Sequence, residues 1–129
     1  MTYPIDRSKW NKSTYEGHYD SLAVEYEGLR CKCKKCLSSF VFEPSEQKRQ
    51  FEGLGRYPYW LPTLCDECQD KWEGIALKIK SFEIAWDSKG IETSEIGRLR
   101  EWLRLIEESK DFQKKDYSSR AAMIKKILD

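Results

Sequence analysis

Two short stretches decide how this chain folds: Cys33-Lys34-Lys35-Cys36 and Cys65-Asp66-Glu67-Cys68. Each C-x2-C turn presents two sulfurs on one side of a tight loop, and two such turns complete the tetrahedron that Zn²⁺ prefers. Residues 37–64 separate the two turns, so the chain between them needs structure of its own. This anatomy is typical of a zinc ribbon, and we expect four cysteines to bind one zinc ion: Cys33, Cys36, Cys65 and Cys68.

Four thiolate ligands predict a structural metal. Catalytic zinc keeps one coordination position open for water or substrate, and four cysteines leave none. Two disulfides or a redox dithiol are the alternative interpretations of these motifs. We find no cleavable signal sequence and no apolar span long enough for a membrane helix, so we expect a cytoplasmic protein that keeps its thiols reduced. This compartment favours the zinc site.

Two further residues could enter the ligand set. Cys31 lies in C-x-C spacing to Cys33 and is either a substitute ligand or a spare thiol beside the site. His18 is the only histidine of the chain and could reach the metal from the N-terminal segment. Because the four paired cysteines already satisfy zinc, a surface or packing role is favoured for His18.

The composition is that of a globular protein with a polar surface. The 129 residues are 35% charged and 40% hydrophobic, and the formal net charge is +1. Basic and acidic residues number 4 and 5 in residues 1–30, 6 and 6 in 31–70, and 13 and 11 in 71–129. A large electrostatic footprint on nucleic acid would gather the basic residues instead. The length suits a metal-stabilised module that shares an interface with a helical one.

The first half of the chain predicts an irregular arm followed by a ribbon. Residues 1–28 lack helical periodicity and form an arm that packs through its aromatic residues. These are Tyr3, Trp10, Tyr15, Tyr19 and Tyr26. The ribbon spans 29–69, with strands at 29–32 and 39–43 that form a hairpin across the first cysteine motif. A short helix from Pro44 follows, capped by Ser45 or an adjacent group and stopped by Gly53 and Gly55, before an extended loop over 56–62.

The order of these features resembles a known family. Cys33-x-x-Cys36, Phe40-Val41-Phe42, Glu46-Gln47, Phe51, Gly55, prolines and Cys65-x-x-Cys68 follow one another as in the probable zinc-ribbon domain of small bacterial proteins. The resemblance covers roughly residues 30–70 and implies zinc bound by the four matching cysteines. It implies little about activity, because a metal motif defines that family. Leu37 departs from the family pattern, which usually has glycine after the second cysteine.

The second half predicts helices. A first apolar stripe indicates a helix over 70–88 with Gly90 as its C-terminal cap, and a second stripe follows a cap at Thr93 or Ser94. A third helix starts near Ser118 or Ser119, and Phe112 and Tyr117 pin the linker before it. The expected fold class is therefore α+β: a small four-cysteine zinc ribbon with a β-hairpin, followed by a helical hairpin and a C-terminal helix. We expect the helical region, 70–129, to pack on the ribbon.

One surface cluster suggests a binding role. It comprises Arg56, Tyr57, Tyr59 and Trp60 in a proline-stiffened loop, with the basic residues Lys34 and Lys35 of the first cysteine motif. Aromatic and arginine side chains in a stiff loop can anchor a protein partner or stack on unpaired bases. The alternative is structural, because Tyr59 or Trp60 could fill the small ribbon core.

Three classes of function follow. The first is stoichiometric binding of a protein partner, with the specific hypothesis of a small cytosolic inhibitor such as an immunity protein that neutralises a bacterial toxin. The second is nucleic-acid binding through the basic motif and the aromatic loop. The third, an enzyme, has little support, because the sequence has one histidine, no glycine-rich phosphate loop and no nucleophile elbow. We expect neither a membrane partner nor a small-molecule substrate.

Overall fold

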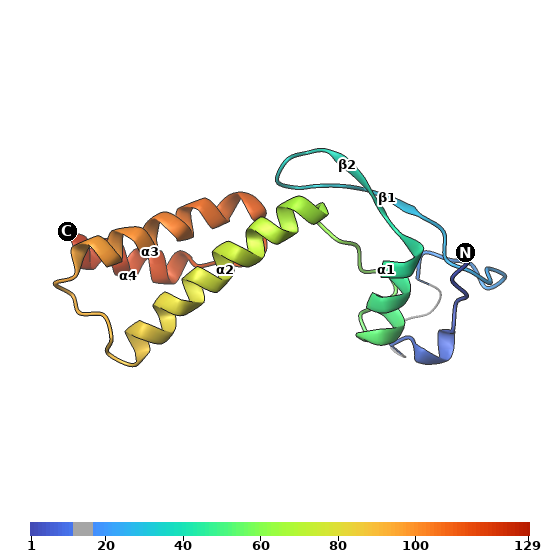
Figure 1. Ribbon diagram of the computed structural model, residues 1–129, viewed down its shortest axis with the longest axis horizontal. Coiled ribbons are helices and arrows are strands. Elements are labelled where there is room, and N and C mark those ends of the chain that lie inside the picture. Colours follow the sequence, from blue (N-terminus) through green and yellow to red (C-terminus); the bar gives the residue numbers. More distant parts are fainter. Residues whose placement is uncertain (12–16) are drawn as a thin grey trace. The chain divides into compact units, whose positions relative to one another are not determined.

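The computed structural model describes residues 1–11 and 17–129, so Tyr15 lies outside the described residues. The described chain has the α+β composition predicted from sequence, with one two-stranded antiparallel sheet and four α-helices (Figure 1). It divides into two compact units. The hairpin unit comprises residues 1–33 and 38–65, and the helical unit comprises 34–37 and 66–129. The predicted domain boundaries and the packing of the helical region on the ribbon stay predictions.

The predicted hairpin is confirmed. Strand β1, Leu29–Lys32, pairs antiparallel with β2, Ser39–Phe42. The register places Leu29 opposite Phe42 and Lys32 opposite Ser39. Side chains alternate between the two faces of the sheet, so Cys31 and Phe42 are buried while Arg30 and Lys32 are exposed.

The short helix after the hairpin begins at its proline. Helix α1, Pro44–Lys48, continues into η2, a π-helical turn over Arg49–Gly53. The predicted cap at Ser45 is wrong: Pro44 occupies the first turn, where its missing N–H costs nothing, and Glu43 becomes the N-cap without a side-chain hydrogen bond. The predicted stop is confirmed, because the π-helix ends at Gly53 and Gly55 has a φ of +72°.

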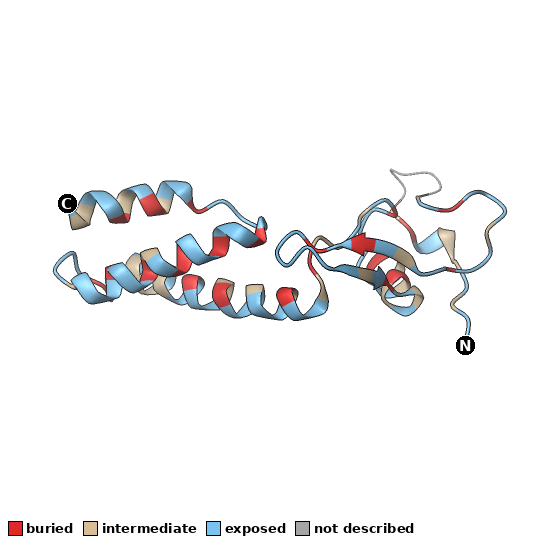
Figure 2. Ribbon diagram, turned by 90° about the horizontal axis from the view of Figure 1, so that it is seen from above, coloured by how far each residue is buried: buried red, intermediate tan, exposed pale blue. Residues whose placement is uncertain are grey.

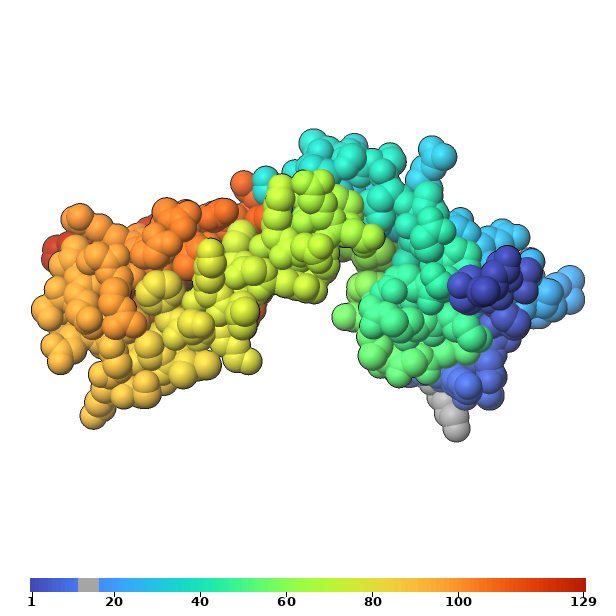
Figure 3. All heavy atoms as spheres, viewed as in Figure 1, coloured from blue at the N-terminus to red at the C-terminus, as the bar shows by residue number. Residues whose placement is uncertain are grey.

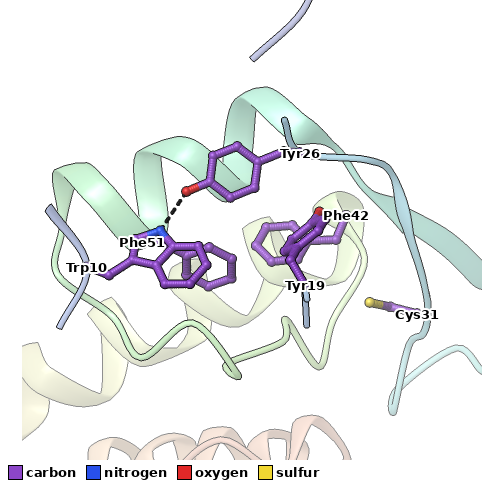
Figure 4. Packing of buried hydrophobic residues seen from close by; sticks show 6 residues of the cluster. All are labelled: Trp10, Tyr19, Tyr26, Cys31, Phe42 and Phe51. Atoms are coloured by element: carbon purple, nitrogen blue, oxygen red, sulfur yellow. Dashed lines mark hydrogen bonds between the residues drawn. The ribbon is translucent and has the colours of Figure 1, made fainter. Parts of the chain in front are cut away.

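Aromatic residues of the N-terminal segment pack into the core of the hairpin unit. A 3-10 turn, η1, spans Arg7–Lys9 and leads into Trp10. The buried cluster consists of Trp10, Tyr19, Tyr26, Cys31, Phe42 and Phe51 (Figure 4). Figure 3 shows the N-terminal residues, in blue, lying directly against the α1–η2 segment, in green. The predicted aromatic anchoring of this segment is therefore confirmed for Trp10, Tyr19 and Tyr26.

A buried glutamine joins three segments of the hairpin unit. Gln47 is fully buried, and its Nε2 donates to the carbonyls of Glu27 (2.6 Å) and Phe42 (2.7 Å). Its Oε1 accepts from the Tyr19 hydroxyl (2.5 Å), which in turn accepts from the backbone N–H of Glu27 (2.9 Å). These bonds tie the Tyr19 side chain, the Glu27 backbone and the end of β2 to the short helix.

A second network centres on Glu52, whose side chain is 5% exposed. Its carboxylate accepts from the Tyr26 hydroxyl (2.7 Å), the Asp6 backbone N–H (3.1 Å) and Lys48 Nζ (2.9 Å). The Tyr26 hydroxyl also accepts from Trp10 Nε1 (2.8 Å), the bond drawn in Figure 4. A buried carboxylate is tolerated here because charged and polar donors surround it.

The helical unit is built on regular apolar stripes. Helix α2, Asp66–Asp87, packs against α3, Ile96–Ser109, and α3 also packs against α4, Ser118–Leu128. A 3-10 turn, η3, spans Lys110–Phe112. Buried positions recur along the helices (Figure 2). They include Ile75, Ile79, Leu99, Trp102, Leu105, Ile106 and Ile124.

The core of the helical unit is rich in ring contacts. Trp102 is fully buried and stacks on Phe82, with ring centroids 5.9 Å apart and planes 8° apart. Phe112 and Tyr117 both contact the ring of Trp72. The predicted anchoring role of these two linker residues is confirmed, as is the start of the last helix at Ser118.

Three helix boundaries differ from the sequence-based expectation. Helix α2 begins at Asp66 and not at residue 70, because the second cysteine motif forms its first turn. Helix α3 has Glu95 as N-cap, and not Thr93 or Ser94. The residue with left-handed backbone after α2 is Lys89, with a φ of +61°, rather than Gly90.

The backbone hydrogen bonds at the C-terminal end of α2 explain why a glycine follows Lys89. The backbone N–H of Lys89 donates to the Trp86 carbonyl (3.0 Å), and that of Gly90 donates to the Ala85 carbonyl (2.6 Å). This pair of bonds is the Schellman motif, in which the left-handed residue precedes the one that closes the outer bond. A Cβ on Gly90 would lie 3.2 Å from the Ala85 oxygen, so the motif leaves little room for a side chain there.

Candidate metal centre

The cysteine quartet, Cys33, Cys36, Cys65 and Cys68, forms one cluster. Its four Sγ atoms all lie within 4.8 Å of one another. Tetrahedral zinc–thiolate bonds of about 2.3 Å imply sulfur–sulfur distances of about 3.8 Å, so a small contraction of the cluster fits a metal ion. None of the five cysteines of the chain, all within the described residues, forms a disulfide. The quartet could therefore hold a metal ion.

The first cysteine motif follows directly from the hairpin. Cys33 comes immediately after β1, is fully buried, and donates its backbone N–H to the Ser38 carbonyl (2.9 Å). This bond closes the turn that carries Cys36, whose side chain is exposed. Leu37 completes the turn with a φ of +64°. That conformation favours glycine, the residue that the resembled family usually has at this position. In this chain, Leu37 therefore places a side chain where the backbone disfavours one.

The second cysteine motif is the start of a helix. Cys65 precedes α2 and Cys68 lies in its first turn, with Cys65 half-buried and Cys68 5% exposed. The first turn of a helix presents N–H groups without helical partners and the positive end of the helix dipole. Both stabilise thiolates, which are the metal-binding form of cysteine.

The two additional ligand candidates lie outside the metal-binding group found among the described residues. Cys31 belongs to the aromatic core, and burial raises the pKa of its thiol. His18 is exposed, and its Nε2 lies 3.0 Å from the Tyr59 carbonyl oxygen. Its ring packs edge-on against Tyr59, with centroids 5.6 Å apart. Cys31 is thus a packing residue and His18 supports the loop that precedes the second cysteine motif.

The aromatic loop, residues 56–61, contains both exposed and inward-facing rings. Tyr57 and Tyr59 are 53% and 55% exposed. Trp60 is half-buried and packs edge-on against Phe42, with ring centroids 5.7 Å apart. The Arg56 guanidinium carbon lies 4.3 Å from the centroid of the Trp60 ring. Of the two alternatives predicted for this loop, a binding surface suits the two tyrosines and core packing suits Trp60.

The basic residues of the first cysteine motif are exposed. Lys34 and Lys35 both face solvent, and Lys35 Nζ lies 5.5 Å from the centroid of the Phe112 ring. Lys34 and Lys35 belong to the helical unit, whereas the aromatic loop belongs to the hairpin unit. The expected proximity of these lysines to the loop therefore stays a prediction.

Sequence reasoning missed two features of the hairpin unit. Gln47 and Glu52 were not recognised as buried, because a polar residue in a short helix ordinarily faces solvent. Arg30 was also missed as an outward-facing neighbour of Lys32, although period-two alternation in the strand around Cys31 was the signal that could have found it.

Comparison of the chain with protein-family models, curated proteins and solved structures finds no match. The resemblance to the zinc-ribbon family of small bacterial proteins therefore stays a prediction. Across residues 1–11 and 17–129, no helix combines the length and the apolar composition that crossing a bilayer requires.

Proposed function

We propose that the chain is a non-enzymatic zinc-ribbon protein that binds a protein partner stoichiometrically. The cysteine quartet would hold one structural zinc ion, because four thiolates supply a complete tetrahedral ligand set and leave no position for a substrate. The metal would stabilise the two turns that carry these cysteines. The proposed site of partner binding is the aromatic loop.

The observation that carries this proposal is the exposure of large apolar side chains on a constrained loop. Leu54, Tyr57, Tyr59 and Leu61 are 59%, 53%, 55% and 38% exposed within eight consecutive residues. Contiguous exposed apolar side chains commonly mark an interaction surface. Tyrosine is among the residues that contribute most to binding when they anchor an interface.

Several contacts hold the loop in one conformation. Pro58 between the two tyrosines is fully buried, and a Cβ on Gly17 would lie 2.6 Å from the Pro58 Cβ. The Trp60 N–H donates to the Tyr57 carbonyl (2.8 Å), which closes a turn. Arg56 Nε donates to Gln50 Oε1 (2.6 Å). A loop that is ordered before binding loses less conformational entropy on binding, which favours affinity.

The specific form of the proposal is a small cytosolic inhibitor, such as an immunity protein that neutralises a bacterial toxin. Such a protein needs a rigid fold and an interaction surface but no chemistry of its own. Unoxidised cysteines are compatible with a reducing compartment such as the cytoplasm.

Co-purification from the source cells, with nuclease treatment and high-salt washes, tests the proposal. We expect a protein partner in a fixed stoichiometry, and Tyr57→Ala with Tyr59→Ala should weaken its binding by about 30-fold or more. Leu77→Ala with Ile84→Ala is the matched control, because these α2 side chains are 67% and 59% exposed. Absence of a tight partner, or equal losses in both double variants, would contradict the proposal.

A second candidate function is nucleic-acid binding through Lys34, Lys35 and the aromatic loop. It is favoured by the exposure of both lysines and by the arginine beside Trp60, since cationic and aromatic groups together bind single strands. Its signature is an affinity that falls steeply with salt concentration. If Lys34→Glu with Lys35→Glu leaves RNA and DNA binding unchanged, this candidate is excluded.

A further inference from the structure

The charged residues of the hairpin and its connecting turn are all basic. Residues 29–42 contain four basic residues and no acidic one, whereas the whole chain has 23 basic and 22 acidic residues. Two of the four, Arg30 and Lys32, lie on β1 itself. The hairpin therefore departs from the near-neutral charge of its surroundings.

The register of the hairpin places these cations on one face. Arg30 is opposite Val41, and Lys32 is opposite Ser39. All four side chains are exposed, while Cys31 and Phe42 on the other face are buried. We call the exposed set, Arg30, Lys32, Ser39 and Val41, the outer face of the hairpin.

No acidic group neutralises this face within the described residues. Neither Arg30 nor Lys32 has an ion-pair partner there, although exposed basic residues elsewhere do. Arg49 pairs with Glu46, Arg104 with Glu101, and Lys110 with Glu107. The outer face thus presents two cations with their charges available to a ligand.

The strand that carries the cations also has an unpaired edge. The sheet contains only β1 and β2 in the part of the chain that is described, so β1 has a strand on one side alone. An extended segment can add to such an edge by backbone hydrogen bonds. Side chains two residues apart on a strand are separated by about 7 Å, so Arg30 and Lys32 match carboxylates at alternate positions of an extended peptide.

We infer that the outer face of the hairpin binds an extended acidic segment of the protein partner, with carboxylates against Arg30 and Lys32 and an apolar side chain against Val41. This inference rests on the proposed function and names the chemistry of the partner. Val41 is 48% exposed and lies opposite Arg30 on β2, so it gives the face an apolar contact point beside the cations. A partner with a strongly basic surface at this position would be repelled.

The same face suits a nucleic acid less well. Single-stranded nucleic acids are bound by aromatic side chains on which bases stack. The aromatic residues of β2, Phe40 and Phe42, pack toward the aromatic core on the opposite face. Two cations without an aromatic platform favour an acidic peptide with an apolar residue.

A labelled extended peptide with two glutamates and a valine at successive alternate positions, separated by threonines, is the probe for this inference, because all three side chains then point to the same side. We expect it to bind the metal-loaded full chain in fluorescence anisotropy, with an affinity that falls as salt concentration rises. Arg30→Glu with Lys32→Glu should weaken binding by about tenfold or more. Lys80→Glu with Arg100→Glu is the matched control, because these exposed helix residues form no described ion pair, and it should leave binding unchanged.

Other results overturn the inference. No binding of the peptide, or equal binding by the two double variants, contradicts it. If a single-stranded oligonucleotide of the same charge binds more tightly than the peptide, and Arg30→Glu with Lys32→Glu abolishes that binding, the ligand of the outer face is a nucleic acid and not an acidic peptide. Equal thermal melting of wild type and variants, expected for exposed positions, excludes misfolding as the cause.

The inference and the proposed function fail separately. If the partner from the source cells still binds Arg30→Glu with Lys32→Glu but not Tyr57→Ala with Tyr59→Ala, the acidic-segment inference is wrong and the proposed function stands. If no protein partner co-purifies at all, the proposed function is wrong whatever the peptide does.

Discussion

The hairpin unit and the helical unit reach a stable core by different means. The helical unit satisfies its backbone groups within helices and buries aliphatic and tryptophan side chains at regular spacing. The hairpin unit has one four-residue strand pair and a short helix, and its core is aromatic. The side chains of Gln47 and Glu52 bond to the backbone there.

The two units should therefore be sensitive to different changes. A unit with little regular structure depends on a few polar side chains and, in this account, on a metal, because small cores contribute little stability. A unit of packed helices depends on shape complementarity in its core. Changes aimed at the metal or the polar networks should therefore affect the hairpin unit, and changes to buried rings should affect the helical unit.

Metal removal should change the relative stability of the two units most. Structural zinc sites contribute on the order of 10 kcal/mol to folding, so the chelated protein should lose the tertiary structure of the hairpin unit. Near-ultraviolet circular dichroism of the aromatic core should collapse, while the far-ultraviolet helix signal from α2, α3 and α4 persists. An unchanged melting curve after verified metal removal would contradict this, and Cys31→Ala, outside the quartet, should retain the metal.

Truncation of Trp102, the central ring of the helical unit, should have the second largest effect on stability. Trp102→Ala removes a fully buried side chain that stacks on Phe82, and it should destabilise the helical unit by about 3–5 kcal/mol. The loss should appear in far-ultraviolet thermal melts with metal content unchanged. Trp102→Phe is the control, with a smaller loss expected, because Trp102 Nε1 is buried without a hydrogen-bond partner in the described structure. Equal losses in both variants would show that ring packing is not the cause.

Removal of the buried Gln47 side-chain amide should destabilise the hairpin unit. Gln47→Leu should destabilise the hairpin unit by about 2–3 kcal/mol, because it removes the three buried hydrogen bonds that the amide makes to the Tyr19 hydroxyl and to the carbonyls of Glu27 and Phe42. Chemical denaturation followed by near-ultraviolet circular dichroism measures this effect. Ser45→Ala in the same helix is the control, and a Gln47→Leu variant as stable as wild type would show that the network is not needed.

Alkaline pH should unfold the hairpin unit before the helical unit, because the hairpin unit has more buried tyrosines. Burial, the largest cause, raises the pKa of Tyr19 and of Tyr26 above the usual value near 10. Their neutral forms therefore contribute stability that is fully present below about pH 10 and is lost as pH rises above it. The helical unit contains one tyrosine, Tyr117, whose pKa burial also raises.

We therefore expect the near-ultraviolet signal of the hairpin unit to be lost above pH 10 before the far-ultraviolet helix signal. A combined absorbance and circular dichroism titration measures both. Tyr57→Phe with Tyr59→Phe is the control, since these exposed side chains lie outside the buried aromatic cluster and their replacement should leave the order of the two losses unchanged. Simultaneous loss of both signals would contradict the expectation.

Relief of backbone strain has the smallest expected effect. Leu37 and Lys89 have φ values of +64° and +61°, a region that disfavours side chains. Leu37→Gly and Lys89→Gly should each stabilise the protein by about 1 kcal/mol. Denaturant unfolding checks both, with Lys78→Gly inside α2 as a control that should destabilise by about 1 kcal/mol. A destabilised Leu37→Gly would mean that the exposed leucine makes a stabilising contact.

Much of the fold could be predicted because its signals are local. Strand-forming runs on either side of the first cysteine motif predicted the hairpin, apolar periodicity predicted the helices, and paired cysteines predicted the cluster. The start of α2 was missed because a C-x2-C motif has the same sequence whether it forms a loop or a first helical turn. The end of α2 was assigned to Gly90 because glycine is the usual left-handed residue, whereas the backbone bonds put Lys89 there.

The polar networks could not be predicted from local pattern. Gln47 and Glu52 are buried because they meet Tyr19, Tyr26 and Asp6, residues at least 26 positions away in the chain. No periodicity within a short helix contains that information. The cluster shows only that four sulfurs could hold a metal ion, and the choice of zinc stays a prediction from the chemistry of thiolate ligands.

The proposed structural zinc site is best tested by native mass spectrometry of the protein purified without added metal, followed by the same measurement under denaturing conditions. We expect one zinc ion per chain in the native spectrum, loss of that ion on denaturation, and no zinc in a Cys33→Ser, Cys68→Ser variant. A metal-free native chain, or a denatured mass lowered by the hydrogens that two disulfides remove, would contradict it.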